Sequence, residues 1–94
     1  MPKTLTERDA TAKLKDLPGW RLQNGHLWRD LQFHDFLEAM DFVNDLAALA
    51  EEQEHHPDIH IHYNQVSLEV WTHSEEGLTD KDFALAKEIT KLIE

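Results

Sequence analysis

The chain has 94 residues, which suffices for one small domain and leaves no room for a second hydrophobic core. Its 9 Lys and Arg oppose 19 Asp and Glu, and the resulting formal net charge of −10 disfavours direct binding to nucleic-acid phosphates. Cysteine is absent, which excludes disulfides, thiolate zinc sites and a cysteine nucleophile.

The sequence also lacks the signals of a membrane or exported protein. No apolar run approaches the length of a membrane span, and the N-terminus shows no apolar core followed by a small-residue cleavage site. We therefore expect one cytoplasmic domain over residues 1–94, without membrane association. Because a small domain gains buried area by oligomerising, we also expect a homodimer or homotetramer.

The first predicted element is a helix. It begins at the capping box Thr6-Glu7-Arg8-Asp9 and stops at Pro18-Gly19. Its apolar positions recur at helical spacing and are Ala10, Leu14 and Leu17.

A β-hairpin follows this helix. Asn24-Gly25 separates two short alternating segments, which is a strong local signal for a tight turn. A two-residue turn there pairs Gln23 with His26 and Leu22 with Leu27. The hairpin therefore has one apolar face.

Two further helices are predicted, over residues 35–54 and 79–94. The expected apolar face of the first consists of Phe36, Met40, Val43, Ala47 and Ala50. The expected apolar face of the second consists of Phe83, Ala86, Ile89, Thr90 and Ile93.

A second hairpin is predicted between these helices, because residues 58–63 and 66–72 alternate with period two. A two-residue turn at Asn64-Gln65 pairs Ile61 with Leu68 and Ile59 with Val70 as core pairs. The element order is then αββαββα. We expect an α+β fold with one four-stranded antiparallel sheet and three helices packed on one face.

Histidine is the residue type with the clearest chemical potential, since the chain contains seven and four lie between Glu54 and Tyr63. His55 and His56 close the long helix, with Glu51 one turn earlier and Pro57 forcing the exit. One interpretation is a charged helix end, because the macrodipole favours histidine there. The other is a pair of proton-transfer groups, because imidazole titrates near neutral pH.

Metal binding is a third interpretation. His60 and His62 share one face of a strand, a spacing that can hold a metal. The chain has neither a His-Glu-x-x-His motif nor a cysteine, and such a strand pair is more often a solvated or interface face. We predict no metal site.

Three residues of the C-terminal third are further candidates for a site. Asp82 stands at the third helical position of the capping box Thr79-Asp80-Lys81-Asp82, which explains it without any activity. His73 lies at a strand end, where site residues are common. Trp71 falls on the strand face opposite Val70, which indicates a partner subunit, a ligand shelf or partial cover by loops.

Taken together, these residues resemble a known signature. The set Glu51-x-x-x-His55-His56-Pro57, Tyr63, His73 and Asp82 is similar, in residue type and spacing, to that of the pterin-4a-carbinolamine dehydratases. The run from Thr72 to Asp82, the αββαββα order, the chain length and Pro18-Gly19-Trp20 also look like that family. The resemblance covers the whole chain.

The resemblance implies a hydro-lyase that converts 4a-hydroxytetrahydrobiopterin to quinonoid dihydropterin and water. Such an enzyme recycles the pterin cofactor of aromatic amino acid hydroxylases, chiefly phenylalanine hydroxylase, and needs no metal or bound cofactor. It also implies dimers or tetramers. By matching positions, His55, His56 and His73 would be catalytic, and Glu51 and Asp82 would bind or orient. A flat pterin ring also suits an aromatic wall, for which Trp71 is the candidate.

The alternative is a non-catalytic interaction or dimerisation module on the same fold, acting as a transcriptional cofactor does. Animal members of the family also serve as dimerisation cofactors of a homeodomain transcription factor. Three histidines at the matching positions argue for the enzyme, because a binding module does not need imidazoles that exchange protons.

Overall fold

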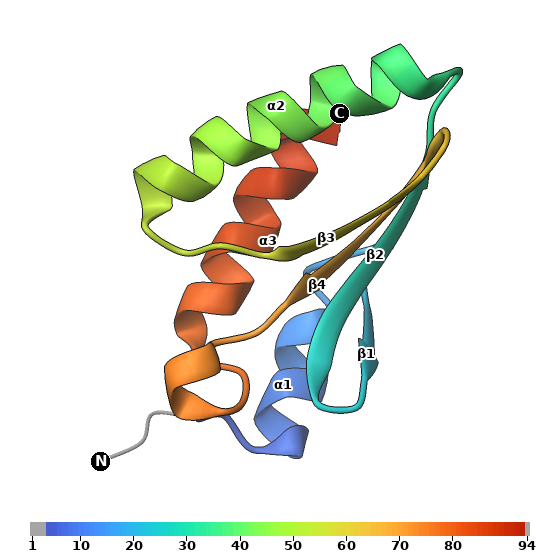
Figure 1. Cartoon of the computed structure of the whole chain (residues 1–94). Helices are drawn as coiled ribbons and strands as arrows, with labels where there is room; N and C mark the ends of the chain where they lie inside the picture. The colour runs from blue at the N-terminus through green and yellow to red at the C-terminus, as the bar shows by residue number, and fades with distance from the viewer. Residues whose placement is uncertain (1–3, 94) are drawn as a thin grey trace.

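The computed structural model describes residues 4–93 and has the predicted element order (Figure 1). Four antiparallel strands form one sheet in the order β1-β2-β4-β3, and the three α-helices lie on one face of it. This arrangement confirms the α+β prediction. The elements are α1 (Glu7–Leu14), β1 (Arg21–Gln23), β2 (His26–Gln32), α2 (Phe36–Gln53), β3 (Asp58–His62), β4 (Gln65–Val70), the short 3-10 helix η1 (His73–Glu75) and α3 (Asp80–Ile93).

The hydrophobic core lies between the sheet and the helices. Its largest fully buried residues come from β2, β4, α2, α3 and the segment after α1, and they are Leu17, Leu27, Leu46, Val66, Leu68, Val70, Leu85 and Ile89. Within residues 4–93, no helix combines the length and apolar character that crossing a bilayer would require.

The first hairpin has the predicted register, with Gln23 opposite His26 and Leu22 opposite Leu27. Asn24 and Gly25 both have positive φ, as a type I′ turn requires. The helix before it ends at Leu14, earlier than Pro18-Gly19 predicts. Leu17 is nevertheless buried, because the chain continues against the core in successive turns.

The second hairpin differs from the prediction. Its turn is Tyr63-Asn64, so Ile61 pairs with Val66 and Ile59 with Leu68. The cause is an anchor that local sequence does not show: the Asn64 side chain donates to the Phe33 carbonyl at 3.0 Å, while the Asn64 carbonyl accepts from the Phe33 amide at 2.8 Å. A two-residue shift keeps every side chain on its predicted face. It places Ile61 close to the turn of the hairpin, where the residue is 37% exposed and is not part of the core.

The predicted apolar face of α2 is also wrong in part. The helix buries Ala39, Phe42, Leu46 and Ala50, whereas Phe36 is 46% exposed and Ala47 is exposed. Apolar residues occur on more than one face of this helix, so their spacing alone does not decide which face is buried. Met40 and Val43 of the predicted face are half-buried, and Val43 packs against the edge of the core.

The start of α2 is stabilised by Asp35, whose Oδ1 accepts a hydrogen bond from the Glu38 amide at 2.9 Å. We expect Asp35→Ala to lower the free energy of unfolding by about 1 kcal/mol, since an N-cap acceptor is lost. Urea unfolding measures this effect. Asp41→Ala, at an exposed position of the same helix, is the control; equal midpoints for the two variants would contradict the prediction.

Candidate active site

A cavity of about 380 Å³ lies where the end of α2, the start of β3 and the end of β4 meet. Its lining includes His55, His56, Asp58, Trp71 and His73. The chain reaches this arrangement because Glu54 ends α2 in a left-handed conformation, its N–H bonded to the last helical turn, and Pro57 then directs the chain into β3.

His55 is oriented by a buried carboxylate. Its Nε2 lies 2.5 Å from Oδ1 of Asp82, which is fully buried at the start of α3. The other oxygen of Asp82 accepts from the Thr72 hydroxyl and from the Thr79 amide, each at 2.8 Å. Asp82 therefore caps its own helix and holds His55 at the same time. Because Asp82 occupies Nε2, the Nδ1 atom of His55 is the nitrogen left for a reacting group.

His56 is held differently, at the surface. Its Nε2 lies 2.5 Å from Oε2 of Glu51, and the two side chains are 62% and 77% exposed. An exposed pair of this kind is stabilised far less than a buried one, because water screens the charges. Glu51 therefore orients His56 without fixing it as firmly as Asp82 fixes His55.

His73 begins η1 on a short loop that is closed at its base. The Thr72 amide donates to the Gly77 carbonyl at 2.9 Å, and the Gly77 amide donates back at 3.3 Å. The His73 ring stacks on the Trp71 indole, with centroids 3.9 Å apart. The indole N–H donates to Oδ2 of Asp58 at 3.1 Å, and the same oxygen lies 3.7 Å from Nε2 of His73.

The other face of the Trp71 indole is covered as well. His26, at the start of β2, stacks on it with centroids 4.2 Å apart. Two rings about 4 Å from one indole centroid cannot lie side by side on the same face, because their atoms would overlap. His26 and His73 therefore cover opposite faces, and Trp71 borders the cavity with its edge.

The six residues predicted from the sequence thus gather in one region. His55, His56, His73 and Trp71 line the cavity, Asp82 lies behind His55, and Glu51 lies beside His56. Sequence reasoning missed three neighbours, Asp58, His26 and Glu69. Asp58 directly follows His-His-Pro, which is a usable signal, whereas His26 reaches the site only through the pairing of β2 with β4.

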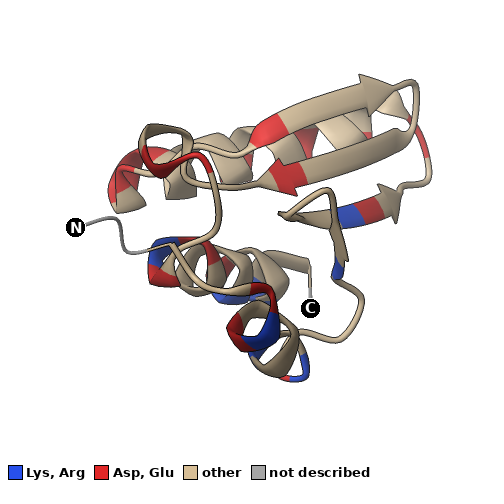
Figure 2. Cartoon of the chain, turned by 90° about the horizontal axis from the view of Figure 1, so that it is seen from below, with Lys and Arg blue, Asp and Glu red and all other residues tan. Residues whose placement is uncertain are grey.

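The site lies in an acidic part of the molecule. No Lys or Arg occurs between Arg29 and Lys81 in the sequence. Figure 2 accordingly shows the basic residues on α1, α3 and the β1–β2 ribbon. Lys81 is the basic residue that lines the cavity. Within residues 4–93, no group of three or more His, Asp or Glu side chains is arranged to hold a metal ion.

Further along the outer face of the sheet, the polar groups pair with one another. Asp30 accepts hydrogen bonds from the Ser67 hydroxyl and the Arg21 guanidinium, each at 2.8 Å. The Ser67 hydrogen bond, with help from Arg21, lowers the pKa of Asp30 below its ordinary value. A lowered pKa makes this carboxylate a weaker base, so the cluster is a poorer candidate for acid–base chemistry than the histidines.

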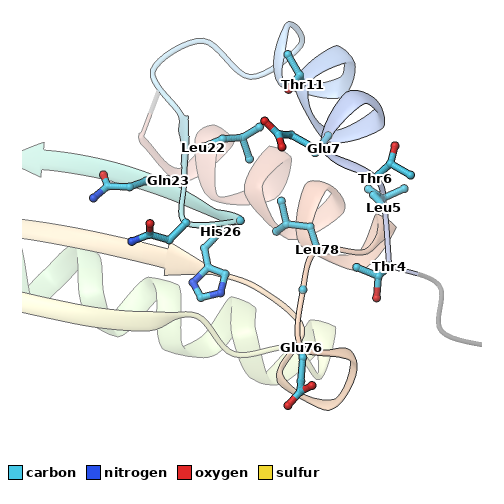
Figure 3. Close-up of a pocket in the computed structure, with 14 residues that line it drawn as sticks. Thr4, Leu5, Thr6, Glu7, Thr11, Leu22, Gln23, His26, Glu76 and Leu78 are labelled. Atoms are coloured by element: carbon cyan, nitrogen blue, oxygen red, sulfur yellow. The ribbon is translucent and has the colours of Figure 1, made fainter.

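A larger cavity, of about 550 Å³, lies between the start of α1, the β1–β2 turn and the loop after η1. The lining includes Leu5, Leu22 and Leu78, and Figure 3 shows the Glu7 carboxylate beside Leu22 and the Glu76 carboxylate turned away from the leucines. His26 is its single histidine, and none of the three predicted catalytic histidines lines it. The smaller cavity is therefore the candidate active site.

Comparison with known proteins identifies the family of the chain. The sequence profile of the pterin 4 alpha carbinolamine dehydratase family matches residues 3–92. A protein of Thermomicrobium roseum, provisionally named a pterin-4-alpha-carbinolamine dehydratase, is 49% identical over 89% of this chain and 92% of its own length. A protein of Sulfolobus acidocaldarius with the same name is 42% identical over 94% of this chain and 97% of its own length.

Two solved structures share the fold. A "transcriptional coactivator/pterin dehydratase" from Brucella melitensis superposes with a TM-score of 0.89 at 33% identity, over 95% of this chain and 97% of that one. A "pterin dehydratase-like protein" described as a RuBisCO assembly factor of the α-carboxysome superposes with a TM-score of 0.68 at 26% identity, over 79% of this chain and 88% of that one. By profile, sequence and fold, the chain belongs to the pterin-4a-carbinolamine dehydratase family.

Proposed function

We propose that the protein removes water from 4a-hydroxytetrahydrobiopterin, or from a closely related 4a-hydroxytetrahydropterin, to give the quinonoid dihydropterin. The observation that carries this proposal is the convergence of His55, fixed by buried Asp82, and His73 on one cavity in a chain of this family. The reaction would recycle the pterin cofactor of an aromatic amino acid hydroxylase, such as phenylalanine hydroxylase. It requires neither a metal nor a resident cofactor.

The chemistry asks for two proton transfers. The bond between the ring carbon and its hydroxyl oxygen breaks, and that oxygen takes a proton as it leaves as water. The neighbouring ring nitrogen loses its proton to a base, and its electron pair forms the new double bond to carbon. Neutral imidazole and protonated imidazole can perform both transfers near neutral pH.

We assign these transfers to His55 and His73, with His56 helping to bind and protonate the substrate. In this assignment Asp82 holds His55 in one orientation and stabilises its protonated form, as the carboxylate of an Asp–His pair does. Glu51 orients His56 at the cavity mouth. Trp71 borders the pterin with its edge, since both faces of the indole are already covered.

Stopped-flow absorbance tests the proposal. The 4a-hydroxytetrahydropterin is generated by a phenylalanine hydroxylase, and its decay is followed with and without this protein. We expect the protein to accelerate the decay in proportion to its concentration, and His73→Ala to remove most of the acceleration. Decay at the uncatalysed rate in the presence of folded protein would contradict the proposal.

The second candidate function is a non-catalytic interaction module. This candidate is supported by the names of the two solved relatives, a coactivator/dehydratase and an assembly factor. The two functions make opposite predictions about the histidines. A partner protein that binds the wild type and the His55→Ala, His73→Ala double variant equally well, together with an inactive wild type, would favour the module.

A further inference from the structure

We propose that Trp71, Asp58 and His26 are positioning residues for His73. We call the three residues the His73 clamp. The expected effect on kcat rests on the proposed function, but the orientation of the His73 ring can be measured without any substrate. The family signature described above includes His73 and none of the three clamp residues.

His73 needs an external restraint. It lies at the start of a three-residue 3-10 helix on a loop, and its side chain is 56% exposed. A half-exposed side chain on a loop samples several rotamers, and a proton-transfer group has to meet its substrate within a narrow range of distance and angle. His55 obtains that order from a buried carboxylate, whereas the carboxylate near His73 is only half-buried.

The first part of the restraint is the stack of three rings. Trp71 lies between His26 and His73, at interplanar angles of 12° and 25°. Trp71 directly follows the last residue of β4, Val70, which pairs with Leu27 of β2, so the indole starts from a point held close to the sheet. A ring pressed between two others cannot rotate without displacing one of them. Trp71 therefore presents a fixed plane against which the His73 ring lies.

The second part is Asp58. One oxygen, Oδ2, accepts the indole N–H of Trp71 and lies within ion-pair distance of Nε2 of His73. The same oxygen thus restrains the rotation of the Trp71 indole and draws Nε2 of His73 toward Asp58. The Nδ1 atom of His73 then lies on the side of its ring away from Asp58.

The third part is the pair His26–Glu69, which supports the stack from behind. Nδ1 of His26 lies 2.5 Å from Oε2 of Glu69, and both side chains are largely buried, at 19% and 16% exposure. Glu69 stands on the central strand β4, paired with Trp28 of β2 and Asp58 of β3. The restraint on His73 therefore originates in the rigid middle of the sheet, which suits a positioning device.

If the clamp positions His73, its loss should lower kcat and leave KM nearly unchanged. We expect Asp58→Ala and Trp71→Leu to lower kcat for dehydration by about tenfold or more, because misplacement of a reacting group weakens proton transfer. KM should change much less than kcat. Asp58→Asn should restore most of kcat, because its amide oxygen can still accept the indole N–H. His62→Ala, a change of an exposed histidine on the same sheet face, is the control and should keep the wild-type kcat.

A spectroscopic readout separates this inference from the proposed function. In ¹H–¹³C spectra of histidine-labelled protein, the His73 ring protons should lie upfield of those of exposed His62, because the indole ring current shields them. His73→Ala identifies the resonances by their loss. Asp58→Ala should move them toward the positions of His62, whereas Asp58→Asn should move them less.

Both readouts have outcomes that overturn the inference. Wild-type His73 resonances at the positions of an unstacked histidine would overturn it whether or not the protein dehydrates pterins. Full kcat in both Asp58→Ala and Trp71→Leu, in an active enzyme, would also overturn it. If the wild type proves inactive, the proposed function fails, while shielded His73 resonances that depend on Asp58 would still support the clamp.

Discussion

Replacing His55 with glutamine is expected to lower kcat for dehydration by about 100-fold to 10,000-fold, the usual contribution of a general acid or base. Glutamine can still donate an N–H to Asp82, so the buried carboxylate keeps a partner. It cannot exchange a proton near neutral pH. The stopped-flow assay described above measures the loss directly, and a variant that turns over at the wild-type rate would remove His55 from the mechanism.

Two controls make this result specific. His34→Ala changes an exposed histidine before α2, outside the cavity lining, and should leave turnover unchanged. His55→Ala should be as inactive as His55→Gln but less stable, because one oxygen of buried Asp82 then loses its hydrogen-bond partner. Equal stability of the alanine and glutamine variants would mean that the His55–Asp82 contact contributes nothing to folding.

Asp82→Ala is expected to have the largest effect on stability in the site. The carboxylate is fully buried and accepts hydrogen bonds from His55, the Thr72 hydroxyl and the Thr79 amide. Its loss leaves the His55 ring and the Thr79 amide without their acceptor, while the Thr72 hydroxyl keeps only its contact with the Thr79 hydroxyl. Breaking a buried hydrogen-bonded network around a carboxylate costs about 3–5 kcal/mol. We therefore expect a large drop in the denaturant midpoint together with a drop in kcat.

The neighbouring aspartate provides the control for this variant. Asp80 stands two residues earlier, and its side chain is 81% exposed and paired with Lys13 at 3.4 Å. Asp80→Ala should change the free energy of unfolding by less than about 1 kcal/mol, because exposed pairs contribute little. If Asp82→Ala and Asp80→Ala shifted the midpoint equally, the buried network would have no special role in stability.

The comparison of the two hairpins explains how much of the fold can be predicted from the sequence. Asn24-Gly25 determines its own turn, because both residues adopt positive φ, and the predicted register is confirmed. The second turn is determined by a contact 31 residues away, between Asn64 and Phe33, and its predicted register is wrong. Local rules therefore succeed where the determinants are local.

The candidate site divides in the same way. His55 and His56 follow from the end of one helix, and Asp82 follows from a capping box, so short-range patterns find them. His26 and Glu69 reach Trp71 because β2 pairs with β4, and nothing in a short segment specifies strand order in a sheet. The sequence therefore identifies the proposed proton-transfer groups and Asp82 better than it identifies the residues around Trp71.

The dual use of Asp82 has an evolutionary consequence. The residue caps α3 and anchors the Thr72–Thr79 loop, so folding alone is enough to preserve it. His56 and His73 are more than half exposed, so their substitution would cost little stability. A descendant released from catalysis would thus keep the aspartate and lose these histidines first. Retention of all three histidines beside Asp82 is then the informative mark of an enzyme, and the aspartate alone is a mark of the fold.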